Sequence, residues 1–260
     1  MSTDIILVDR EADIATVTLN RPEKLNALTK PMWKRLGEVL RELSADDGLR
    51  CLVLRGAGEK SFAPGNDISE FANTRSNSAQ AREYGKVHHE ALAALYECRH
   101  PMVALIHGIC VGGGFEIAAL CDLRICGMSS RFGVPINRLG LSLGLREMRA
   151  LLTLAGKAVT LEILLEGRVF GAEEALQKGL VTRVVPDDKV EGEAYATARR
   201  IADGAPLVAR WHKQFMRRLL DPAPLTAADL DLGYACYDTE DFRTGYQTFL
   251  AKTKPGFKGR

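Results

Sequence analysis

Apolar residues along the first 190 positions fall into two kinds of run. Short, nearly continuous runs rich in valine, isoleucine and leucine are typical of buried strands, and longer runs with helical spacing are typical of amphipathic helices. The runs that predict strands lie at 5–10, 13–20, 51–56, 102–108, 123–127 and 180–185. Between them, Thr29 and Pro31 open a predicted helix that reaches about Leu43, and a longer helix is predicted from about Ser78 to Cys98. This alternation predicts a mainly parallel sheet with covering helices.

The pattern changes after about Asp187. The strand-like runs cease, and the stretches 191–206, 207–220 and 225–252 have helical spacing. We therefore predict a β/α core over residues 1–190, followed by a helical region over residues 191–260. The segment 56–67, which is rich in turn residues, is predicted to be a loop.

Composition and charge favour an ordinary globular protein. The chain is 46% hydrophobic and 26% charged, and its formal net charge of +2 gives no electrostatic reason to expect a nucleic acid or an anionic membrane as a partner. The start, MSTDIILVDR, lacks a signal-peptide pattern and no run of about 18 apolar residues occurs, so we expect a cytoplasmic protein.

The six cysteines form no C-x-x-C pair, which predicts small buried side chains rather than disulfides. His88 and His89 are adjacent, so they should point to different helix faces, and without spaced partners no metal site is expected.

Two glycine motifs suggest chemistry but fit poorly. The glycines around position 112 match neither the P-loop nor the dinucleotide-binding fingerprint, because Ile117 stands where the latter needs a glycine. The segment GLSLG at 140–144 matches the G-x-S-x-G nucleophile motif, with His212 as the one histidine beyond Ser142. A nucleophile elbow needs a hydrophobic strand before it, and the preceding FGVPINRLG is a poor strand. A serine hydrolase that uses Ser142 is therefore kept as an unrelated alternative.

A third arrangement joins two distant stretches, SFAPGNDISEF at 61–71 and HGICVGGGFE at 107–116. Each follows a strand pattern and offers a tight glycine turn before a helix. The start of a helix carries free N–H groups and partial positive charge. Two such turns that face each other can direct two backbone N–H groups at one oxygen, which is the geometry of an oxyanion hole.

Five segments in this order identify a family resemblance. LNRPEKLNAL, SFAPGNDISEF, GICVGGGFEIAALCDLRIC, FGVP with the following LGL, and LLEGRVFGAEEALQKGLVTRVVP are similar to segments of the enoyl-CoA hydratase/isomerase (crotonase) family, and the similarity runs from about Ile14 to the closing PGFKGR. The resemblance implies an α/β fold, a crotonase-like spiral of repeated β/α units, with C-terminal helices that build a homotrimer or hexamer. It also implies an acyl-CoA substrate, with coenzyme A as part of the substrate and no separate cofactor.

The resemblance assigns roles to individual residues. The oxyanion N–H groups fall on Asn66 and Gly113, where a bulky side chain would block the thioester, and Glu116 matches the first of two catalytic glutamates. A carboxylate at the start of a helix can also serve only to satisfy N–H groups, which is the alternative for Glu116. The positions that match substrate and CoA contacts are Lys24, Leu25, Ala27, Ala63, Gly65, Asp67, Ile68, Gly112, Phe257 and Lys258. Of these, Leu25, Ala63 and Ile68 fit ordinary packing equally well.

One position departs from the family pattern. The second glutamate of the hydratases follows the proline of an FG-x-P segment, and that position is Ile136 here. Isoleucine transfers no proton, whereas general acid–base groups contribute roughly 10²–10⁴ in rate. The glycine-rich stretch just downstream is also changed and brings in Glu147 as a candidate acid/base. We therefore expect a hydratase or isomerase that uses Glu116 with a substitute proton donor. The alternatives are a decarboxylase or C–C bond-cleaving acyl-CoA enzyme, and a catalytically silent acyl-CoA binder.

Overall fold

The computed structural model describes residues 4–260, and its larger sheet has six strands. These are β1 (Ile6–Glu11), β2 (Ile14–Leu19), β3 (Cys51–Gly56), β5 (Met102–Ile106), β7 (Leu123–Gly127) and β10 (Arg183–Val185). Their order in the sheet is β1-β2-β3-β5-β7-β10; β1 pairs antiparallel with β2, and every other pair is parallel. All six predicted strand runs are present, and the prediction of a mainly parallel sheet is confirmed.

A second, smaller sheet was not predicted. It contains β4 (Ser61–Ala63), β6 (Ile109–Val111), β8 (Arg131–Gly133) and β9 (Phe170–Gly171), in the order β4-β6-β8-β9. The loop predicted at 56–67 is therefore wrong in part, because β4 lies within it. Strands of two or three residues are too short to produce an alternating or continuous apolar pattern. Parallel pairing of β4 with β6 brings the two glycine turns that follow these strands to the same edge.

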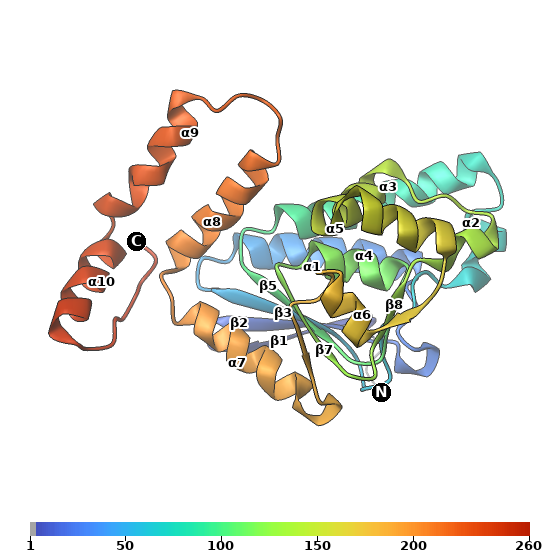
Figure 1. Cartoon of the computed structure of the whole chain (residues 1–260), viewed down its shortest axis with the longest axis horizontal. Coiled ribbons are helices and arrows are strands. Elements are labelled where there is room, and N and C mark those ends of the chain that lie inside the picture. The colour runs from blue at the N-terminus through green and yellow to red at the C-terminus, as the bar shows by residue number, and fades with distance from the viewer. Residues whose placement is uncertain (1–3) are drawn as a thin grey trace.

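Helices cover both faces of the larger sheet (Figure 1). The helices are α1 (Lys30–Ala45), α2 (Phe71–Thr74), α3 (Ser78–Glu97), α4 (Gly113–Leu120), α5 (Leu145–Glu166), α6 (Ala172–Gln177), α7 (Val190–Ala202), α8 (Pro206–Leu219), α9 (Ala227–Asp231) and α10 (Glu240–Ala251). Short 3₁₀ segments lie at η1 (Pro22–Lys24), η2 (Ile68–Glu70), η3 (Pro135–Leu139), η4 (Asp187–Lys189) and η5 (Leu232–Asp238). The predicted cap is confirmed, because the Thr29 hydroxyl accepts from the backbone N–H of Met32 at 3.3 Å. No helix within residues 4–260 is long and apolar enough to cross a membrane.

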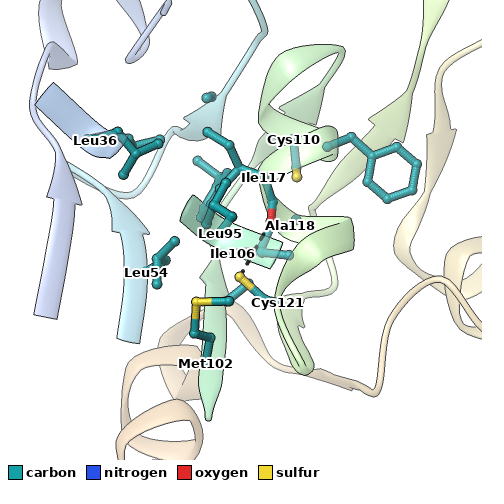
Figure 2. Packing of buried hydrophobic residues seen from close by; sticks show 14 of the residues in the cluster. Leu36, Leu54, Leu95, Met102, Ile106, Cys110, Ile117, Ala118 and Cys121 are labelled. Carbon is teal, nitrogen blue, oxygen red and sulfur yellow. Dashed lines mark hydrogen bonds between the residues drawn. The ribbon is translucent and has the colours of Figure 1, made fainter. Parts of the chain in front are cut away.

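The main core lies between the larger sheet and helices α1, α3, α4 and α5. Figure 2 shows side chains from α1, β3, α3, β5 and α4 packed together there, among them Leu36, Leu54, Leu95, Ile106 and Ile117. Five of the cysteines are buried, as predicted, and none of the six forms a disulfide. Burial raises the pKa of the Cys51 thiol to about 12, which keeps it protonated and unreactive.

The helices after the core differ in where they lie. Helix α7 packs on the other face of the sheet, where Val190, Ala194 and Ala198 join residues of β3, β5 and β7 in a second cluster. Helices α8, α9 and α10 project away from the sheet (Figure 1). The division at residue 190 stays a prediction about sequence organisation, while in packing terms the projecting part begins after α7.

Candidate active site

The two glycine turns touch each other, as the spacing argument predicted. Gly65 has φ +106° and Gly112 has φ +52°, a region that favours glycine. A Cβ atom on Gly65 would lie 3.2 Å from the backbone nitrogen of Gly113, so the two backbones pack too closely for a side chain to fit easily between them. The loop before α1 holds the first turn, because the Leu28 N–H donates to Gly65 O at 2.8 Å and the Leu28 carbonyl accepts from the Asp67 N–H at 2.8 Å. Two separate chain segments are thereby fixed at one point.

Each turn presents a free backbone N–H group. Gly113 is the first residue of α4, where no carbonyl of the helix can accept its N–H. Within residues 4–260, no acceptor engages the N–H of Asn66 either. The start of α4 also carries partial positive charge, so these two donors are groups that can stabilise a developing negative oxygen.

The glycine triplet has a separate physical reason at each position. Gly112 needs its positive φ. A Cβ atom on Gly113 would lie 3.0 Å from Cζ2 of Trp33 and 3.2 Å from Cδ1 of Leu28, so this position is crowded by side chains. A Cβ atom on Gly114 would lie 2.2 Å from the carbonyl oxygen of Ala63, which is backbone and cannot turn aside. Gly114 is therefore a packing requirement between α4 and β4.

The side chain of Asn66 is anchored from two helices. Its Oδ1 accepts from Trp33 Nε1 at 2.7 Å and from the Tyr84 hydroxyl at 3.2 Å. Burial raises the pKa of Tyr84 to about 12, which keeps this hydroxyl a donor. The guanidinium of Arg75 lies 3.5 Å from the centroid of the Tyr84 ring. The sequence alone pointed to none of these three partners, because they come from α1, α3 and the loop after α2.

Glu116 lies one turn into α4 and is buried. It forms no capping bond at the start of α4, and its Oε2 lies 3.1 Å from Nε2 of His88, which is also buried. The ring of His88 packs on Trp33, with the centroids 4.2 Å apart. Glu116 therefore faces a histidine on α3 rather than the N–H groups at its own helix start, which removes the capping alternative.

Glu147 brings a second buried carboxylate to the same histidine. Its Oε1 lies 3.4 Å from Nδ1 of His88 and 3.0 Å from Nε2 of His89. The carboxylate folds back over Gly144, where a Cβ atom would lie 2.3 Å from Oε2. The prediction that the two histidines point to different helix faces is wrong, since α5 lies where both can reach one carboxylate. Nevertheless, no group of ligands within residues 4–260 has the arrangement of a metal site.

Most residues predicted to contact CoA gather around the two turns. Arg21 links the loop before α1 to the turn at Gly65, because its Nη1 donates to Ala27 O at 2.9 Å and to Asp67 Oδ2 at 2.7 Å. The Ser69 hydroxyl and Arg21 together lower the pKa of Asp67 to about 2. Around this link, Lys24, Leu25 and Ile68 are exposed, Ala27 is half-buried, and Ala63, Gly65 and Gly112 adjoin the turns.

Phe257 and Lys258 do not reach this site within one chain. Asp241 at the start of α10 holds them, because its Oδ1 accepts from the backbone N–H of Lys258 at 2.7 Å. The Lys258 ammonium also pairs with Glu240 at 2.8 Å. Figure 1 shows α10 and the C-terminus at the end of the chain away from α4.

Ile136 and Ser142 lie in the segment between β8 and α5. Ile136 is in η3, half-buried, and packs against the main core, where it has no proton to transfer. Ser142 is exposed in the coil between Gly140 and the Gly144 that caps α5, with a 3₁₀ segment rather than a strand before it. The nucleophile elbow is therefore absent at GLSLG.

Two free N–H groups and a buried carboxylate at the start of one helix are groups that can stabilise an oxyanion and transfer a proton. Comparison with known proteins agrees. The family model described as enoyl-CoA hydratase/isomerase matches residues 9–260. A short-chain-enoyl-CoA hydratase of Clostridium acetobutylicum is 33% identical over 100% of both chains. An (E)-benzylidenesuccinyl-CoA hydratase of Thauera aromatica is 34% identical, over 95% of this chain and 96% of its own.

Solved structures agree as well. A crystal structure of an enoyl-CoA hydratase/carnithine racemase from Magnetospirillum magneticum has a TM-score of 0.98 and 49% identity, and the match covers 100% of this chain and 97% of that chain. The chain belongs to the enoyl-CoA hydratase/isomerase family and has the crotonase fold, so the resemblance and the fold class inferred from the sequence are confirmed. It is an enzyme of that family that acts on acyl-CoA.

Proposed function

We propose that this protein hydrates a 2-enoyl-CoA, or shifts the double bond of an enoyl-CoA, through a thioester enolate. The observation that supports the proposal is the meeting of three groups at the start of α4: the free N–H groups of Asn66 and Gly113, and the buried carboxylate of Glu116. The exposed Lys24, Leu25 and Ile68 then border the path of the CoA chain toward these groups. CoA is part of the substrate, and the reaction needs no separate cofactor.

The chemistry follows from where charge develops. When water adds to the β-carbon, or when a proton leaves the substrate, electrons move onto the thioester oxygen. The N–H groups of Asn66 and Gly113 stabilise that oxygen, and a single such donor contributes roughly 10²–10³ in rate. Glu116 takes a proton from water or from the substrate and returns a proton to carbon. The thioester carbonyl is restored when the carbon is protonated.

The experiment is a panel of CoA thioesters tested in two ways. Ligands that bind the folded state raise the melting temperature by mass action, so acyl-CoA species should raise it while the free acids and NAD should not. Product analysis on the same panel, with a short 2-enoyl-CoA first, then separates hydration and isomerisation from decarboxylation, C–C cleavage and silent binding. A serine-directed phosphonate serves as the control for Ser142 and should leave the protein unlabelled. No thermal shift with any CoA species at saturation would contradict the proposal.

We also infer that α8–α10 mediate self-association into a trimer or hexamer. Large apolar side chains on these projecting elements are exposed in the single chain: Leu225, Leu230, Tyr234, Tyr237, Phe249 and Leu250. Many large apolar side chains exposed on neighbouring elements are typical of an interface. Within one chain, Phe257 and Lys258 do not reach the CoA site. In an oligomer, a neighbouring copy would supply them. Sedimentation of the purified protein tests this, and a monomer would contradict it.

A further inference from the structure

His88 occupies an unusual place for a buried histidine. Its two ring nitrogens face carboxylates on two different helices, Nε2 toward Glu116 at 3.1 Å and Nδ1 toward Glu147 at 3.4 Å. A neutral imidazole has one N–H donor and one bare nitrogen, so it can donate to only one of two carboxylates. The other nitrogen would then oppose a carboxylate lone pair unless the cluster holds an additional proton, either on the imidazole or on a carboxyl group. The arrangement therefore favours one shared, mobile proton.

Exposure changes in one direction along the cluster. The side chains of Glu116 and His88 are 6% and 7% exposed. The side chain of Glu147 is 9% exposed, and that of His89, which lies 3.0 Å from it, is 34% exposed. The four groups thus form a connected line from the buried carboxylate beside the oxyanion turns to a ring at the surface.

Of the three links in this line, only that between His89 Nε2 and Glu147 Oε1 has the geometry of a hydrogen bond, and Glu147 Oε2 is buried without a partner among residues 4–260. Glu116 Oε2 and His88 Nε2 are buried and lie off the direction of a hydrogen bond despite their short separation, and no other protein atom of residues 4–260 engages them. Unsatisfied buried polar atoms are rare and call for an explanation such as a catalytic role. Catalytic hydrogen bonds are often long or misaligned without substrate and tighten when it binds.

We propose that Glu116, His88, Glu147 and His89 form a proton relay that replaces the second hydratase carboxylate, lost here at Ile136. When Glu116 takes a proton from the substrate or water, it passes a proton from Oε2 to Nε2 of His88. His88 releases its Nδ1 proton to Glu147 Oε1, and Glu147 passes one through His89 to solvent. Return of the proton to carbon runs the same steps backward. One proton leaves and one returns, no bond forms between residues, and His88 acts through Glu116 as a positioning and relay residue.

Charged and titratable groups near His88 come from three helices. Glu116 faces it from α4, Glu147 from α5, and the neighbouring His89 lies on α3. On its remaining side the packed ring is Trp33, which carries no charge and holds Asn66. The relay therefore touches the oxyanion turn through Trp33.

The test measures how many substrate protons escape to solvent for each turnover. The relay rests on the proposed function, so the test follows the double-bond shift of a 3-enoyl-CoA. The reaction is run in D₂O, and NMR measures the deuterium in each product molecule. The native protein should incorporate deuterium, because the proton taken by Glu116 leaves through His88. His88→Gln keeps an amide near the Nε2 position but cannot pass a proton, so deuterium per turnover should fall by roughly 10-fold or more, with the product still formed. Glu147→Gln should give the same result from another helix.

The control and the outcomes separate the two hypotheses. His100→Asn replaces a buried histidine beyond the end of α3 and should leave deuterium per turnover unchanged. Thermal stabilisation by a CoA thioester checks that each variant folds and binds. Deuterium incorporation that requires Glu116 but is the same in His88→Gln and Glu147→Gln would overturn the relay alone. Absence of both turnover and exchange in the native protein, or their persistence in Glu116→Gln, would overturn the relay together with the proposed function.

Discussion

The oxyanion turns and the carboxylate cluster meet at α4, yet they are held in different ways. The turns at Gly65 and Gly113 are backbone features, fixed by the parallel β4–β6 pair and by bonds from the Leu28 loop. The carboxylates of Glu116 and Glu147 are side-chain features, and their position depends on how α3, α4 and α5 pack. The first region tolerates almost no added atom, whereas the second can change chemistry by single substitutions that keep shape.

The largest expected effect comes from removing the proton of Glu116. Glu116→Gln keeps the shape of the side chain, so we expect the rate of enoyl-CoA turnover to fall by roughly 10²–10⁴ while CoA-thioester binding remains. Steady-state kinetics and ligand-induced thermal shift measure the two effects separately. Fast hydration that survives this substitution would show that the carboxylate region is not catalytic.

The next effect tests the backbone region. Gly113→Val adds atoms against Trp33 and obstructs the oxyanion site, so turnover should fall by about 10²–10³ or more while the fold remains. Gly192→Val is the matched control, because nothing lies within 4 Å of a Cβ atom there. Gly114→Ala, which meets the Ala63 carbonyl, should instead lower the melting temperature more than Gly113→Ala does. Full activity of Gly113→Val would remove Gly113 from the site.

Restoring the missing carboxylate distinguishes a relay-dependent site from an ordinary hydratase site. Native hydration of a short 2-enoyl-CoA should be slow. Ile136→Glu should raise it by about 10-fold, less than the full contribution of a well-placed acid–base group. Because Ile136 packs against the core, a carboxylate there should also cost about 1–3 kcal/mol of stability. Kinetics and chemical unfolding of the same variant test both, and Ile136→Gln controls for the change of shape.

Deletion of Lys254–Arg260 probes the part of the CoA site that one chain lacks. Within the chain the tail bonds to Asp241, Glu240 and Arg50, so its loss should lower the melting temperature by only a few degrees. CoA-thioester affinity should weaken more than folding, because Phe257 and Lys258 are expected at a neighbouring copy's site. Unaltered affinity in the truncated protein would contradict that expectation.

The smallest effect concerns the ion pair between Arg21 and Asp67, which joins the loop before α1 to the turn at Gly65. The folded-state pKa of Asp67 is about 2, below the usual value of 3.8 for an aspartate, so its stabilising contribution is present above about pH 4 and is lost as the pH falls toward 2. Asp67→Asn should therefore lower the free energy of unfolding at pH 7 by at most about 2 kcal/mol. Unfolding curves of the two proteins should converge near pH 2. A difference that does not change with pH would point to lost packing instead.

Local patterns predicted much of the architecture. The six strands of the larger sheet, the Thr29 cap and the helical C-terminal part all follow from periodicity and capping, which act between residues near one another in sequence. The contact between the two glycine turns was also anticipated, because each turn follows a predicted strand of the parallel sheet, β3 or β5. The short strands β4, β6, β8 and β9 were not, since two or three residues carry no periodicity.

The sequence by itself determined the family, the oxyanion turns and the replacement of the second glutamate by Ile136, because glycine spacing and residue identity are local and exact. Only the tertiary structure decided what stands beside Glu116. His88, Glu116 and Glu147 come from three helices, and no periodic or spacing rule relates them. Their convergence depends on the packing of α3, α4 and α5 over the sheet, where two adjacent histidines expected to diverge both reach one carboxylate. A cluster of side chains from several helices is positioned by that packing, and no local pattern in the sequence reveals the cluster.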